Sequence, residues 1–71
     1  MDLRELKRDL SRVFVGQGGV HGLGLNLAKQ AIRVYVDVQP HPDQQEVLDN
    51  LKRAAAPFPV IVVSEEAPQA Q

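Results

Sequence analysis

The stretch VGQGGVHGLGLN, residues 15–26, holds all five glycines of this 71-residue chain, and its conformation decides the fold. If it is a glycine-rich loop that opens a helix, the chain belongs with α/β proteins that bind phosphate groups. If it is instead a β-strand, the chain becomes a small α+β protein with an open sheet. The segments on either side limit the choice.

The segment before the glycines is predicted to be a helix over residues 2–14. Its apolar residues recur at spacings of three and four, which places them on one stripe. Asp2 can cap the first turn, and Gly16 follows soon after the last periodic residue. The stripe consists of Leu3, Leu6, Leu10, Val13 and Phe14.

The segment after the glycines, AIRVYVDV at residues 31–38, is predicted to be a half-buried strand. β-Branched and aromatic residues dominate it, and apolar side chains alternate with polar ones. One side carries Ile32, Val34, Val36 and Val38, and the other carries Arg33, Tyr35 and Asp37.

The rest of the chain is predicted to be a helix, a strand and a tail. Pro42 suits the first position of a helix, and prolines 57 and 59 end it. The run VIVV at 60–63 indicates a short buried strand, and the polar residues 64–71 a disordered tail after a single domain of residues 1–63. The helical stripe consists of Val47, Leu48, Leu51, Ala54 and Ala55.

One hypothesis for the glycine stretch is a nucleotide loop. Its glycines form G-x-G-x-x-x-G, one residue longer than the dinucleotide motif, and a helix over 21–30 would follow. Asp37, about twenty residues on, would take the place of the ribose-binding acid. The fold would then be a partial Rossmann-like βαβαβ unit after an N-terminal helix. The anion-binding residues would be Gly16, Gly18, Gly19, His21 and Gly22.

The other hypothesis is a β-strand, in which leucines 23, 25 and 27 alternate with Gly22, Gly24 and Asn26. It is favoured because Val13 and Phe14 already belong to the first helix, and because each glycine inside a helix costs about 1 kcal/mol relative to alanine. A complete dinucleotide fold also needs a longer chain. Against the strand, the turn at residues 28–30 has no glycine or asparagine, and Leu23, Leu27 and Ala31 also fit a helical stripe.

The favoured fold is therefore a two-layer αββαβ sandwich, with both helices on one face of a three-stranded sheet. The last strand could pair with either member of the hairpin. The opposite face stays open and is the expected site for a ligand or an interface. Its candidate residues are Gly22, Gly24, Asn26, Arg33, Tyr35 and Asp37.

The composition of the chain argues against several classes of function. The net charge is −1, which gives no general attraction to nucleic acid or to an anionic membrane. No apolar run is long enough to span a membrane. The chain has no cysteine, and His21 and His41 show no ligand spacing, so we expect neither a metal nor a cofactor. With serine only at positions 11 and 64 and no threonine, we do not expect nucleophilic catalysis through a hydroxyl group. We expect a non-catalytic chain rather than an enzyme. A core this small favours a homodimer or a protein partner. Because the chain has no cysteine and its first residues do not resemble a secretion signal, we expect it to work in the cytoplasm.

The segments GVHGLGLN, AIRVYVDV and PFPVIVVSEE, within residues 19–66, resemble a small domain found ahead of trypsin-like peptidase domains in some bacterial proteins. The resemblance implies a standalone accessory or interaction unit rather than a protease, and it supplies no catalytic residue. Its glycine strand is matched by Gly19, Val20, Gly22, Leu23 and Gly24, and its valine-tyrosine strand by Ile32, Val34, Tyr35 and Val36.

Overall fold

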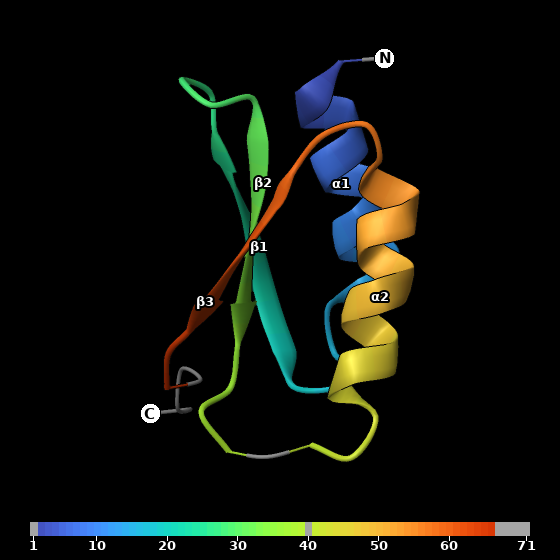
Figure 1. The fold of residues 1–71 in the computed structure, drawn as a ribbon, viewed down its shortest axis with the longest axis vertical. Helices are drawn as coiled ribbons and strands as arrows, with labels where there is room; N and C mark the ends of the chain where they lie inside the picture. Colours follow the sequence, from blue (N-terminus) through green and yellow to red (C-terminus); the bar gives the residue numbers. More distant parts are fainter. Residues whose placement is uncertain (1, 40, 67–71) are drawn as a thin grey trace.

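The computed structural model describes residues 2–39 and 41–66, which form two helices and three strands (Figure 1). The elements follow one another as α1 (Leu3–Phe14), β1 (Val20–Asn26), β2 (Ala31–Val36), α2 (Gln44–Ala55) and β3 (Val60–Ser64). The αββαβ order is confirmed. The helix expected over 21–30 by the alternative βαβαβ fold is wrong, because that segment is β1 and the turn that follows it.

The strands form one mixed sheet in the order β1-β2-β3. β2 pairs antiparallel with β1 and parallel with β3, so the last strand lies beside the second member of the hairpin. Helix α2 connects the two parallel strands. The register of β1 shifts between Val20 and Gly22, where His21 forms a bulge.

Both helices lie on one face of the sheet, as predicted, and the other face is bare of helices (Figure 1). The core forms between these two layers, because the alternating residues of β2 and the helical stripes point toward each other. Leu23 and Leu25 pack against the edge of the core. The buried core consists of Leu3, Leu6, Leu10, Val20, Ile32, Val34, Val36, Val47, Leu48, Leu51 and Ala55.

A four-residue turn, residues 27–30, joins β1 to β2. The Asn26 side chain stabilises it, because its Oδ1 accepts a hydrogen bond from the Lys29 backbone N–H at 3.2 Å. Gln30 closes the turn in the left-handed region, with φ of 53°. Leu27, expected on the apolar face of the strand, belongs to this turn and is exposed.

The helix ends follow the sequence only in part. Asp2 caps α1 as predicted, with Oδ1 accepting from the Arg4 N–H at 3.1 Å. Val13 is 56% exposed, so it is not part of the buried stripe. The second helix begins at Gln44 rather than at Pro42, and Ala54 in its expected stripe is exposed.

Two strand boundaries also differ from the expectation. β2 ends at Val36, and Val38 lies beyond it with 55% of its surface exposed. β3 continues through Ser64, and the Glu65 N–H donates to the Val36 carbonyl at 2.9 Å. The ordered structure thus extends past residue 63, and residues 67–71 of the expected tail lie outside the described part.

Candidate functional site

The uncovered face of the sheet is the candidate site. Alternation along each strand places Gly22 and Gly24 of β1 on this face with Arg33 and Tyr35 of β2. The parallel pairing adds two apolar residues of β3, because Ile61 lies beside Arg33 and Val63 beside Tyr35. We call this set the open face: Gly22, Gly24, Arg33, Tyr35, Ile61 and Val63.

Ile61 and Val63 were missing from the predicted site. The run VIVV contains no polar residue, so its sequence does not show which side chains face the helices. The register with β2 provides that information, and a continuous apolar run gives no register of its own. Both side chains are partly exposed.

Tyr35 occupies the centre of the open face. Its ring lies across the neighbouring strand, where a Cβ added to Gly24 would lie 3.1 Å from Cε2 and from Oη. A Cβ added to Gly22 would lie 3.7 Å from Cδ2. The two bare positions of β1 are therefore covered by a tyrosine from the same sheet, which gives this part of the face a flat aromatic surface.

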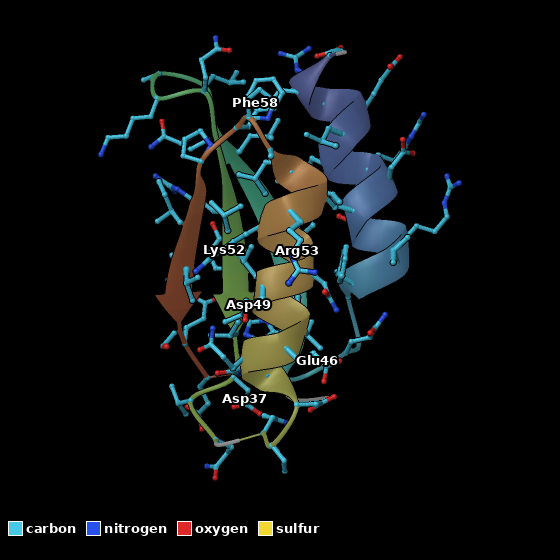
Figure 2. The ribbon with its side chains drawn as sticks, turned by 45° about the vertical axis from the view of Figure 1, so that its right-hand side comes forward. Asp37, Glu46, Asp49, Lys52, Arg53 and Phe58 are labelled. Carbon is cyan, nitrogen blue, oxygen red and sulfur yellow. The ribbon has the colours of Figure 1, made fainter. Side chains whose placement is uncertain are left out.

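Two predicted site residues use their side chains in the connections next to the strands. Asn26 is the last residue of β1, and its carboxamide is engaged in the turn described above. Asp37 follows β2 and lies at the base of the molecule, beneath the start of α2 (Figure 2). Its carboxylate is turned into the β2–α2 connection, where it accepts from the Gln39 N–H at 3.2 Å.

Asp37 and the two histidines gather at this end of the sheet. The Asp37 Oδ2 lies 3.4 Å from the His41 Nε2, and the His21 Nε2 lies 3.4 Å from the Glu65 carbonyl oxygen. The pKa of Asp37 is lowered, first by the Gln39 N–H and then by His41 and His21, against the opposing effect of burial. Across residues 2–39 and 41–66, no group of three His, Cys, Asp or Glu side chains is arranged to hold a metal ion.

The first part of the glycine stretch is a tight loop between α1 and β1. Gly16, Gly18 and Gly19 all have positive φ. Gly18 is buried against α2, and its carbonyl accepts from the Gln44 Nε2 at 3.1 Å. A strand rather than a helix follows this loop. The helix N-terminus that the anion-binding hypothesis needs after Gly16, Gly18 and Gly19 is therefore absent, and His21 and Gly22 lie in β1.

The described residues enclose no pocket. Neither of the helices in this part of the chain has the length and apolar character needed to cross a bilayer. Comparison with protein-family models, with curated proteins and with solved structures gives no match. The resemblance to the peptidase-associated domain therefore stays a prediction.

Proposed function

We propose that this chain is a small, non-catalytic interaction domain that associates with a second copy of itself through the open face. The observation that carries the proposal is the composition of that face. When one face of a sheet is exposed to solvent, the side chains on that face are usually polar, and they alternate along each strand with apolar side chains on the buried face. Here the four side chains that β2 and β3 contribute are Tyr35, Ile61, Val63 and Arg33, and Arg33 is the one charged residue among these four.

The small size of the core supports the same conclusion. A single core in a chain of this length supplies only a few kcal/mol without a disulfide, a metal or a partner. Disulfides are excluded because the chain has no cysteine. Packing two open faces against each other would bury further apolar area around Tyr35, with the helices remaining on the outside.

A catalytic role is less well supported than an interaction role. Asp37 and His41, two residues with acid–base chemistry, contact each other in the β2–α2 connection, and the described part of the chain offers no pocket beside them. A nucleotide-binding role is weakened because β1 takes the place of the required helix. The lack of cysteine suits a chain that works in the cytoplasm, which we include in the proposal.

Sedimentation equilibrium on the full chain tests the proposal. We expect the average mass to rise with concentration toward that of a dimer. Val63→Lys, which places a charge beside Tyr35, should reduce the rise strongly. Val13→Lys is the matched control, because Val13 is an exposed valine on α1, away from the sheet, and it should associate like the wild type. A wild type that stays monomeric at millimolar concentration, or equal behaviour of the two variants, would refute the proposal.

A further inference from the structure

Among residues 2–39 and 41–66, no strand pairs with the outer edge of β3, so this edge presents backbone groups without a partner in the described part. The Ile32 N–H donates to the Pro59 carbonyl at 3.0 Å, and the Glu65 N–H donates to the Val36 carbonyl at 2.9 Å. Because the bonding direction alternates along a parallel strand, the odd-numbered residues from 59 to 65 bond to β2. The N–H and C=O groups of Val60, Val62 and Ser64 therefore point away from the sheet.

The two edge strands of the sheet, β1 and β3, differ in their ability to pair with another strand. At the β1 border, the bulge at His21 interrupts the regular spacing of the strand. Bulges and charged side chains are common means of preventing edge pairing. β3 has neither, since its register with β2 is continuous and the sequence VIVVS carries no charge. Val62, its middle residue, is 40% exposed.

We propose that β3 pairs with β3 of a second copy, antiparallel about a twofold axis through Val62, so that two sheets become one. In this register Val62 lies opposite itself and Val60 lies opposite Ser64. Ile61 lies opposite Val63 on the open face, so apolar side chains meet apolar ones. This contact goes beyond the proposed function, which concerns the face of the sheet, and leaves that face uncovered.

The charges on α2 match this arrangement. Asp49 and Lys52 are exposed and lie one turn apart on the side of α2 nearest β3 (Figure 2). Asp49 is near the middle of α2, as Val62 is the middle of β3. A twofold axis perpendicular to the sheet would bring the two α2 helices side by side and antiparallel. Asp49 of each copy would then face Lys52 of the other, forming two symmetric pairs.

The contact is small, since one five-residue strand and one helix flank take part on each side. Interfaces of this size are weak. We therefore expect a dissociation constant in the micromolar range or weaker.

Charge reversal tests the pairing on the full chain. Asp49→Lys and Lys52→Asp should each weaken self-association by about threefold to tenfold, because each variant places like charges across the axis. An equimolar mixture of the two should restore association, because opposite charges then face each other at both pairs. Arg8→Asp and Asp9→Lys reverse the exposed, adjacent charges of α1 and are the matched controls, for which mixing should change nothing.

The mixture also separates this contact from association through the open face, which would keep the α2 helices on the outside and far from the second copy. A mixture that associates no better than its separate components would overturn the proposal. So would equal association of Val62→Lys and its control Val38→Lys, since both valines are exposed but only Val62 lies on the β3 border.

Discussion

The ring of Tyr35 lies so close to Gly24 that a methyl group on this glycine would be 3.1 Å from the phenol oxygen. This relationship explains why the second part of the glycine stretch can be a strand. Glycine weakens a strand because it has no side chain to pack. An aromatic ring from the neighbouring strand supplies the missing contact.

Alanine substitutions in β1 should reflect this contact. Gly22→Ala should raise the free energy of unfolding by about 0.4–1 kcal/mol, because the added methyl meets Tyr35 at an ordinary 3.7 Å and the unfolded chain loses freedom. Gly24→Ala should be close to neutral, because its methyl displaces the Tyr35 ring. Urea denaturation gives both values, and the ring proton shifts of Tyr35 should change more in Gly24→Ala. A larger gain for Gly24→Ala than for Gly22→Ala would contradict this account.

Alanine substitutions at Gly16 and Gly18, in the loop before β1, should destabilise the chain, unlike those at Gly22 and Gly24. Gly18→Ala should cost about 2–4 kcal/mol of unfolding free energy, because its φ is +56° and its methyl would lie 3.1 Å from the Gln44 Cα. Gly16→Ala should cost only about 1–2 kcal/mol, because its φ is +99° but no atom lies within 4 Å of the added methyl. Thermal unfolding of the two variants compares them. Equal losses would show that the loop does not pack against α2.

The stability of a Gln30→Gly variant should distinguish the β-hairpin from a helix over residues 21–30. Gln30 has a φ of +53°, so Gln30→Gly should stabilise the chain by about 0.5–1 kcal/mol. In a helix over 21–30 the same change would cost about 1 kcal/mol. Lys29→Gly is the control, because Lys29 has no positive φ, and it should destabilise the chain slightly. Guanidinium denaturation measures both, and a less stable Gln30→Gly would argue against the turn.

Much of the fold followed from periodicity. The helices, the alternation in β2 and the placement of both helices on one face were predicted from residues such as Leu6, Leu10, Val34 and Leu51, all of which are buried. These positions are fixed by a repeat that the sequence displays directly.

Other features depend on contacts between distant residues and could not be predicted. Residues 27–30 of the hairpin turn include no glycine. The turn is stabilised instead by the hydrogen bond to the Asn26 side chain and by the left-handed backbone conformation of Gln30. The place of β3 beside β2, and with it the presence of Ile61 and Val63 on the open face, depends on strand pairing. Asp37 does not lie on the predicted face because β2 ends at Val36, two residues earlier than predicted, and because His41 and Gln39 contact its carboxylate.

Asp37 should make the stability of the chain depend on pH in the acid range. Its pKa is lowered from the usual 3.8 in the folded state, chiefly by the Gln39 N–H, so its carboxylate stabilises the fold above that value. This contribution is lost as the pH falls through the lower, folded-state pKa. Asp37→Asn should therefore be less stable than the wild type at neutral pH, and the difference should shrink below pH 3.8. Urea denaturation across this range measures it, and a constant difference would contradict the assignment.

The central claim, that the open face is where this chain meets a second copy, is tested most directly by recording backbone amide NMR spectra of the full chain over a range of concentrations. The account predicts that the amides of Arg33, Tyr35, Ile61 and Val63 shift together as the concentration rises, while those on the exposed side of α1 stay in place. Spectra that do not change with concentration, or changes confined to α1, would contradict it.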